Sequence, residues 1–149
     1  MKPQVAILTV SDRAYAGIYQ DQSGPAIASI AQRQGWKIVR QSIIPDNRRV
    51  IEAVLDHWSK INGYDLILTT GGTGLGPRDV TPEATRAVIE KEIPGITEYM
   101  RSQTLRQNNL SALSRAVAGV SRKSLLINLP GNPQGVQECL NAITHLIEH

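Results

Sequence analysis

The sequence has a single cysteine, no phenylalanine and no long apolar run, and each absence excludes a class of protein. Because Cys139 has no partner within the chain, an internal disulfide is excluded, and the composition fits a reducing compartment. No apolar run approaches the length of a membrane span, and no secretory segment is visible near Met1. We therefore expect a cytoplasmic protein with no membrane partner. A metal site built from clustered cysteines and histidines is also excluded.

Charge and aromatic content argue against a nucleic-acid partner. The formal net charge is +3, from 16 basic and 13 acidic residues, and only 4% of the residues are aromatic. This modest excess of positive charge suits small anionic ligands but is too weak to indicate nucleic-acid binding. Too few aromatic side chains are present to form a base-stacking platform. We expect no nucleic-acid partner.

Predicted strands and helices alternate along the 149 residues, a length typical of one domain. The alternation predicts an α/β fold with a mainly parallel sheet and helices on both sides. The segments 116–120 and 125–129, separated by four polar residues, predict an antiparallel strand pair. Further strands are predicted at 5–10, at 36–44 and at 66–68, the last stopping at two threonines. Helices are predicted from 23 to 35, 50 to 61, 82 to about 92 and 96 to 106, and from 133 onward.

Polar or glycine-rich turns follow four of the predicted strands. Parallel sheets bind ligands beyond the carboxyl ends of their strands, so we expect these turns to meet at one edge. Four segments carry them: Ser11-Asp12-Arg13, Asp46, residues 71–79, and Asn128 to Pro133. Their shared position predicts the binding site more strongly than any one turn does.

The turn after the third strand contains Gly71, Gly72, Gly74 and Gly76 within six positions. Glycines let backbone N–H groups approach a phosphate without a Cβ in the way. No lysine follows these glycines as in a P-loop, and Pro77 breaks the dinucleotide-binding pattern. One glycine would indicate only a tight turn, but four of them with Thr73, Arg78 and Asp79 interleaved favour phosphate binding.

Asp79 lies inside this loop, where a carboxylate would repel phosphate unless a cation lay between them. Magnesium binds one or two carboxylates together with substrate phosphates, so Asp79 and Asp46 are the predicted ligands. Two alternatives stay open from spacing alone. Asp46 is as well placed to cap the helix that follows it, and Asp79 to brace its own loop, with Thr81 the better helix-cap candidate.

Other polar residues near these turns are ambiguous. Asp12 fits a turn residue and Arg13 a surface charge, and Ser114 with Arg115 fits the entry to a strand. Asn128 ends a buried strand, where an amide can recognise the edge of a base or pterin. Turn formation with Pro130 and Gly131 competes with that role.

Taken together, these motifs resemble the molybdopterin adenylyltransferase family of molybdenum cofactor biosynthesis. The resemblance covers nearly the whole chain, and it implies a three-layer α/β/α fold with a mixed sheet, commonly assembled as a homotrimer. It implies that the terminal phosphate of molybdopterin attacks the α-phosphate of ATP with Mg²⁺, and that the product passes to a molybdate-inserting protein. The resemblance rests on Thr9-Val10-Ser11-Asp12-Arg13, Pro45-Asp46, Thr70-Gly71-Gly72-Thr73-Gly74, Arg78-Asp79-Val80-Thr81-Pro82-Glu83-Ala84, Leu113-Ser114-Arg115 and Asn128-Leu129-Pro130-Gly131-Asn132-Pro133.

The resemblance also implies residue roles. Asp46 and Asp79 match the family's essential acids beside the magnesium, and some relatives whose activity is less secure lack an acid matching Asp46. A non-catalytic module that stores or delivers molybdopterin is the alternative, and a tungsten-pathway substrate with the same organic part stays open. The chain stops after its last helix, where several relatives continue. The implied substrate and nucleotide contacts are Ser11, Asp12, Arg13, Thr70, Gly71, Gly72, Thr73, Gly74, Ser114, Asn128, Pro130, Gly131, Asn132 and Pro133.

Overall fold

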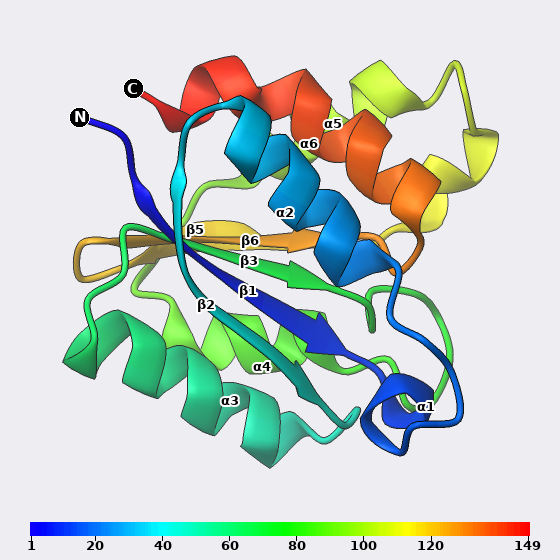
Figure 1. The fold of residues 1–149 in the computed structure, drawn as a ribbon. Coiled ribbons are helices and arrows are strands. Elements are labelled where there is room, and N and C mark those ends of the chain that lie inside the picture. The colour runs from blue at the N-terminus through cyan, green and yellow to red at the C-terminus, as the bar shows by residue number, and fades with distance from the viewer.

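The computed structural model describes residues 1–149, whose strands form one six-stranded sheet between two layers of helices (Figure 1). The strand order is β2-β1-β3-β6-β5-β4, and only β5 runs against the others. This architecture confirms the predicted three-layer α/β/α fold with a mainly parallel mixed sheet. The strands are β1 (Gln4–Val10), β2 (Lys37–Ile44), β3 (Leu66–Thr70), β4 (Lys91–Glu92), β5 (Ala118–Ser121) and β6 (Ser124–Leu129).

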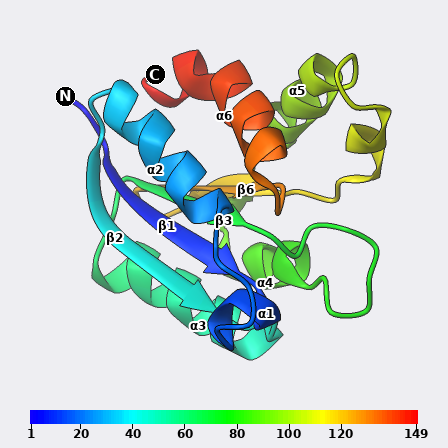
Figure 2. The same cartoon turned by 45° about the vertical axis from the view of Figure 1, so that its right-hand side comes forward.

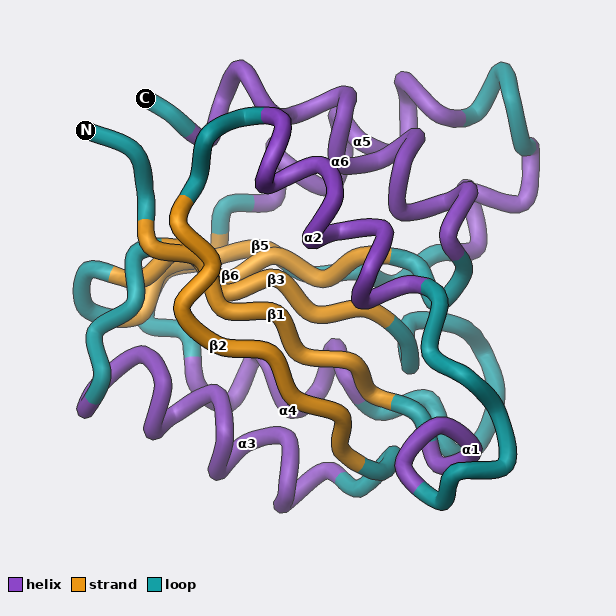
Figure 3. Tube along the Cα trace, viewed as in Figure 1, coloured by secondary structure: helices purple, strands orange, loops and turns teal.

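Helices cover both faces of the sheet, as the trace in Figure 3 shows. Helices α2, α5 and α6 lie on one face, and α3 and α4 lie on the other. None of these helices combines the length and the apolar composition needed to cross a membrane. The helices are α1 (Asp12–Tyr15), α2 (Ser23–Arg33), α3 (Arg48–Asp56) with a π-helical turn (His57–Ile61), α4 (Thr81–Val88), α5 (Pro94–Thr104) with a following 3₁₀ turn (Asn109–Leu113), and α6 (Pro133–Ile147).

Strand β1 is buried on both faces and separates two apolar cores. Val5 and Ile7 pack with α2 and α6, whereas Ala6, Leu8 and Val10 pack with α3 and α4. Successive side chains of a strand point to opposite faces, so a strand covered on both sides needs an unbroken apolar run. The run at 5–10 is therefore explained by its central place in the sheet.

Two predicted boundaries were wrong. Strand β3 continues through Thr69 and Thr70, because both pair with β1 and β6 and are fully buried. Helix α4 ends at Val88 rather than near 92, since Ile89 has extended backbone angles. The next residues instead form β4, which pairs with β5. The helical pattern gave way to this long-range pairing, which local spacing does not encode. The antiparallel pair β5–β6 and helix α6 were predicted correctly.

The chain ends and the carboxyl ends of the parallel strands lie at opposite edges of the molecule (Figure 1). At the chain ends, Lys2 Nζ lies 2.6 Å from Glu148 Oε1, and the Trp36 ring N–H donates to the same oxygen at 2.9 Å. At the other edge, the loop between β3 and α4 extends beyond the strands (Figure 2). All four predicted turns lie at that second edge.

Candidate active site

Backbone contacts hold the four predicted turns together. The Ser11 N–H donates to the carbonyl oxygen of Ile44 at 2.9 Å, which joins the turns after β1 and β2. The Gly71 N–H donates to the carbonyl oxygen of Leu129 at 3.2 Å, which joins the turns after β3 and β6. A Cβ added at Gly131 would lie 3.2 Å from the Gly71 Cα. The predicted convergence at the carboxyl edge is therefore present.

The glycine loop has a backbone shape that other residues would not adopt. Gly71 and Gly72 have φ angles of 99° and 70°, in the left-handed region that favours glycine. A Cβ at Gly71 would collide with the Val10 carbonyl oxygen, and a Cβ at Gly72 with the Thr81 hydroxyl. The loop therefore packs directly against the end of β1 and the start of α4.

Several N–H groups of this loop donate no hydrogen bond within the chain. They belong to Gly72, Thr73 and Gly74, and Thr73 is buried. Unpaired backbone N–H groups away from water are costly, so they normally have a partner. Clustered N–H groups in a glycine loop are suited to bind the oxygens of an anion. This geometry supports the phosphate-binding interpretation.

The two predicted acids reach the loop from different segments. Asp46, after β2, places Oδ1 3.3 Å from the position of a Cβ on Gly72. Asp79 places Oδ2 3.0 Å from the Cβ positions of Gly74 and Gly76, and this oxygen accepts the Gly76 N–H at 2.9 Å. Asp79 thus braces its own loop, which was the predicted alternative to a role as a metal ligand. Oδ1 of Asp46 and Oδ1 of Asp79 accept no hydrogen bond within the chain.

Asp46 does not cap helix α3, so that interpretation was wrong. The N-cap is Asn47, whose side-chain oxygen accepts the Val50 N–H at 3.2 Å. Asp46 Oδ2 instead accepts the Asp12 N–H at 2.8 Å, while Asp12 Oδ1 accepts the Asp46 N–H at 2.9 Å. Asp12 is therefore more than a turn residue, because it fixes the orientation of Asp46.

The pKa values of Asp46 and Asp12 shift in opposite directions, the first mainly through burial and the second mainly through a hydrogen bond from Arg78. Burial raises the pKa of Asp46, and the negative charges of Asp12 and Asp79 raise it further. The hydrogen bond that Asp46 accepts from the Asp12 N–H lowers this pKa and offsets part of the rise. The guanidinium of Arg78, bonded to Asp12, lowers the pKa of that carboxyl. A raised carboxyl pKa marks a site that favours an added positive charge.

Arg115 holds the two ends of the glycine loop, a role that the sequence did not reveal. Its Nε donates to the Gly74 carbonyl oxygen at 2.8 Å and its Nη2 to the Asp79 carbonyl oxygen at 2.8 Å. Its Nη1 lies 2.6 Å from Glu83 Oε2 on α4. The only available signal was an arginine beside the predicted site residue Ser114, because its partners are backbone carbonyls of a loop distant in sequence.

Thr81 was expected to cap α4, and that expectation was wrong. Thr81 lies inside the helix, which Val80 precedes without a side-chain cap bond. The Thr81 hydroxyl is fully buried beside Gly72 and has no hydrogen-bond partner. This hydroxyl lies beside Gly72, as Asp46 Oδ1 does. It therefore adds an unpaired polar atom close to the unpaired N–H groups of the glycine loop.

A cavity of about 470 Å³ opens beside the glycine loop. Helix α6 borders it, and the Asn132 side chain caps that helix by accepting the Gly135 N–H at 2.7 Å. Burial raises the pKa of the Cys139 thiol in its wall to about 11. The predicted site residues in its lining are Thr73, Gly74, Ser114, Pro130, Gly131 and Asn132. Sequence reasoning missed the other lining residues, which include Leu75, Glu138 and Cys139.

Five further predicted residues lie at the same edge. Ser11, Thr70 and Gly71 line a small hollow of about 30 Å³ between β1 and β3, and the Thr70 hydroxyl donates to the Pro130 carbonyl oxygen at 2.5 Å. Pro133 lies at the first turn of α6, outside the larger cavity. Arg13 extends over the Tyr19 ring, 5.7 Å from its centroid, as a surface charge.

Asn128 does not reach any of these cavities. Its side chain is fully buried, with Oδ1 accepting the Val117 N–H at 3.0 Å. Its Nδ2 donates to the hydroxyls of Thr69 at 2.9 Å and Thr85 at 3.0 Å. Both amide hydrogens are thus used inside the core, so this geometry favours a structural role over recognition of a base or pterin edge.

Comparison with known proteins assigns the chain to a family. Residues 6–149 match the family model described as a probable molybdopterin binding domain. The chain belongs to this family. Molybdopterin adenylyltransferase of Helicobacter pylori strain J99 is 42% identical over 141 residues, which cover 93% of this chain and 80% of that protein.

Other members of the family differ in length. The molybdopterin biosynthesis enzyme MoaB of Thermus thermophilus superposes with a TM-score of 0.91 and 43% identity, covering 98% of this chain and 94% of that one. The Drosophila melanogaster molybdenum cofactor synthesis protein cinnamon is 39% identical over 144 residues. That match covers 96% of this chain but only 24% of the fly protein. The family fold thus occurs both alone and within longer chains.

Proposed function

We propose that this protein adenylylates molybdopterin. A terminal phosphate oxygen of molybdopterin forms a bond to the α-phosphorus of ATP, the bond from that phosphorus to the β-phosphate bridging oxygen breaks, and pyrophosphate leaves. The family and its similarity to named adenylyltransferases support the reaction. One structural observation carries the proposal for this chain. Asp46 and Asp79, each with one carboxylate oxygen free, lie beside a glycine loop whose N–H groups are unpaired.

The residues fit a magnesium ion. Oxygen ligands from one or two carboxylates, completed by phosphate oxygens and water, are what Mg²⁺ prefers. Asp46 and Asp79 offer two such oxygens, and no group of three acidic, histidine or cysteine side chains forms a metal site from protein ligands alone. The ion would neutralise phosphate charge and polarise the phosphorus under attack. Asp46 and Asp79 would hold it, and Asp12 would orient Asp46.

The chain's own groups would position the two substrates. N–H groups of Gly72, Thr73 and Gly74 would bind phosphate oxygens, and Arg115 would keep the loop in that shape. The 470 Å³ cavity beside the loop is large enough for a heterocycle and is walled partly by apolar side chains. Holding the nucleophilic and electrophilic phosphates together at this edge converts a bimolecular step into an effectively unimolecular one.

Assembly and location are part of the same proposal. We infer a homotrimer, a transfer of the product to a molybdate-inserting protein, and a cytoplasmic site of action. The family resemblance supports the first two, and the single cysteine is compatible with a reducing compartment. Light scattering on the purified protein measures the mass of the assembly, and a monomer would contradict the first inference.

The test is anaerobic incubation of the protein with molybdopterin, ATP and Mg²⁺, with mass detection of adenylylated pterin and measurement of pyrophosphate. We expect both products from the native chain, and neither from Asp79→Asn. Asp56→Asn is the matched control, because Asp56 pairs with Lys60 on the exposed side of α3. Tight pterin binding without adenylylation would instead support a storage or delivery module.

A further inference from the structure

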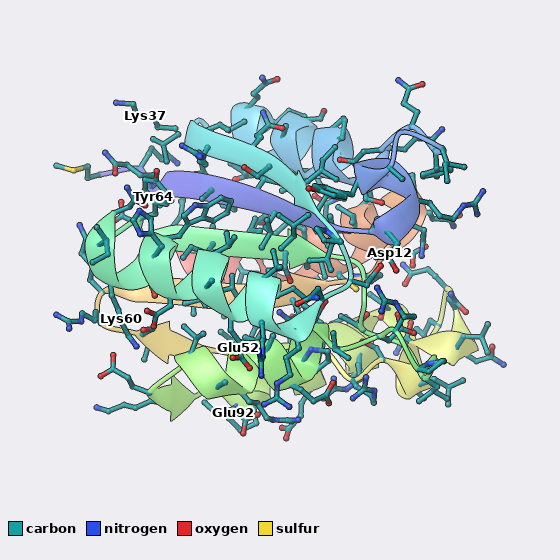
Figure 4. All side chains as sticks on the ribbon, turned by 90° about the horizontal axis from the view of Figure 1, so that it is seen from below. Asp12, Lys37, Glu52, Lys60, Tyr64 and Glu92 are labelled. Atoms are coloured by element: carbon teal, nitrogen blue, oxygen red, sulfur yellow. The ribbon has the colours of Figure 1, made fainter.

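The glycine loop and helix α1 are joined by a two-bond ion pair. Arg78 Nε donates to Asp12 Oδ2 at 3.0 Å, and Arg78 Nη2 donates to Asp12 Oδ1 at 3.1 Å. The two residues are 66 positions apart in sequence and belong to the turns after β3 and β1. Figure 4 shows Asp12 at the end of the sheet opposite Lys60 and Tyr64. The pair therefore lies at the edge that carries the proposed site.

The Arg78 guanidinium lies near Asp46, one of the two proposed metal ligands, and its charge acts on that carboxylate. Asp79 follows Arg78 in sequence. Asp12, which Arg78 binds, and Asp46 each accept a hydrogen bond from the other's backbone N–H in their side-chain carboxylates. The charge of Arg78 acts on Asp12 as well. A fixed positive charge among these acids provides part of the compensation that a divalent cation would provide, so the two cations oppose each other.

The ion pair is exposed to water. The Arg78 side chain is 65% exposed and that of Asp12 is 40% exposed, and pairs in such contact with water hold together weakly. A guanidinium fork matches phosphate as well as carboxylate, with two parallel N–H···O bonds to either. The proposed phosphate cradle begins on the same loop, a few residues before Arg78.

We propose that Arg78 is a phosphate-contacting residue with two competing partners, the Asp12 carboxylate and the phosphate chain of the nucleotide. This inference rests on the proposed function. Paired with Asp12, Arg78 weakens binding of a divalent cation by the acids. Bonded to the phosphate chain, Arg78 no longer offsets the negative charge of Asp12 and Asp46, so the acids bind the cation more tightly. Nucleotide binding and cation binding are then coupled through one arginine.

A purely structural role of the Arg78–Asp12 pair would give different results. If the pair only fastened the glycine loop to α1, Arg78→Gln would lower the thermal midpoint and change no ligand affinity in the folded protein. Competition predicts affinity changes of opposite sign for the two ligands, with the midpoint nearly unchanged. Opposite signs are the decisive observation, because loss of loop structure would weaken both ligands together.

The experiment measures two affinities on the full chain, without relying on turnover. Binding of Mn²⁺ alone is followed by electron paramagnetic resonance, and binding of ATP alone by calorimetry in the presence of a chelator. For Arg78→Gln we expect Mn²⁺ to bind up to about fivefold more tightly and ATP at least about tenfold more weakly. Arg78→Lys keeps the positive charge, so it should bind Mn²⁺ as the native chain does. It should bind ATP more weakly than the native chain does, because an ammonium group lacks the two parallel N–H donors of a guanidinium.

Arg86→Gln is the matched control, since Arg86 is an exposed arginine on α4 paired with Glu92. It should leave both affinities unchanged. Inorganic tripolyphosphate replaces ATP in a further arm, and the same loss of affinity in Arg78→Gln would place the contact on the phosphate chain.

Three results would overturn the proposed exchange of Arg78 between Asp12 and phosphate. If the native chain binds ATP and Arg78→Gln binds it equally well, the exchange is wrong and the proposed function stands. If Arg78→Gln weakens Mn²⁺ and ATP alike, the pair is a structural link. Should the native chain bind neither ATP nor tripolyphosphate, the proposed function and the exchange would both be wrong.

Discussion

Asp12 and Asp46 each accept a hydrogen bond from the other's backbone N–H, at 2.9 and 2.8 Å. This reciprocal pair fixes the turn after β1 to the turn after β2 and leaves Asp46 Oδ1 directed toward Gly72. Two carboxylates brought this close repel each other, and the backbone donors together with Arg78 compensate part of that repulsion. The arrangement has consequences that can be measured in variants with single changes.

Asp46→Asn should abolish cation-dependent turnover and raise the thermal midpoint at neutral pH. Asparagine keeps an oxygen for the Asp12 N–H but removes a charge that burial and its neighbours disfavour. Because the pKa of Asp46 is raised on folding, its ionised form destabilises the native state, and this penalty disappears as pH falls through that pKa. The difference in midpoint between variant and native chain should therefore shrink toward acid pH, as thermal melts across a pH series would show.

Asn47→Ala provides the contrast with Asp46. It removes the true cap of α3, so the free energy of unfolding should fall by about 1 kcal/mol while turnover per folded molecule is retained. An Asp46→Asn protein less stable than the native chain at neutral pH would contradict our account of that carboxylate.

Arg115→Ala should loosen the glycine loop. The change removes donors to two loop carbonyls and leaves Glu83 without its ion-pair partner. Hydrogen bonds from charged groups contribute about 1.5–3 kcal/mol, and we expect a loss of stability in this range by urea unfolding. Hydrogen exchange should also accelerate at the Gly76 and Asp79 amides, which are bonded within the loop. Unchanged exchange there would show that the loop holds its shape without Arg115.

Asn128→Ala tests a structural role in the core, and Ser114→Ala tests a contact with the ligand. The first change strands the buried Val117 N–H, which makes the protein less stable by about 1–3 kcal/mol. Ligand affinity of the folded fraction should be nearly retained. Ser114 lines the cavity, so its loss should weaken pterin binding with little change in stability. If Asn128→Ala weakens binding without destabilising the protein, Asn128 contacts the ligand and its structural role is wrong.

Cys139 should react slowly in the native protein. Its thiol has a pKa of about 11 because it is buried, so only about a thousandth is thiolate at pH 8. Alkylation by iodoacetamide, followed by mass spectrometry, should accelerate as pH rises and become rapid in urea. A ligand that fills the cavity should slow it further, because Cys139 lines the wall.

The sequence predicted the elements whose patterns are local. Strand β1 and helix α6 have apolar spacings that match their surroundings on the sheet, and both were expected near their observed bounds. Strand β4 was missed because two residues carry no period, and only pairing with β5 makes them a strand. The end of α4 was misplaced for the same reason.

The candidate site shows the same difference between local patterns, which could be predicted, and long-range contacts, which could not. The carboxyl-edge rule placed Asp46, Asp79 and the glycine loop together without any coordinates. What it could not provide were contacts between distant turns. The ambiguous roles of Asp12 and Arg115 depend on partners 32 to 66 positions away. The buried Asn128 amide depends on hydroxyls of two other elements for its hydrogen bonds.

The contact between Lys2 and Glu148 brings the two chain ends side by side, away from the edge that carries Asp46. Polypeptide added at either end would leave from a surface that takes no part in the proposed chemistry. The same geometry would let the ends be joined by a short linker and the chain reopened elsewhere, in a circular permutant that keeps the edge intact. A module with this arrangement can be inserted into a larger polypeptide with its reactive side still open to substrates.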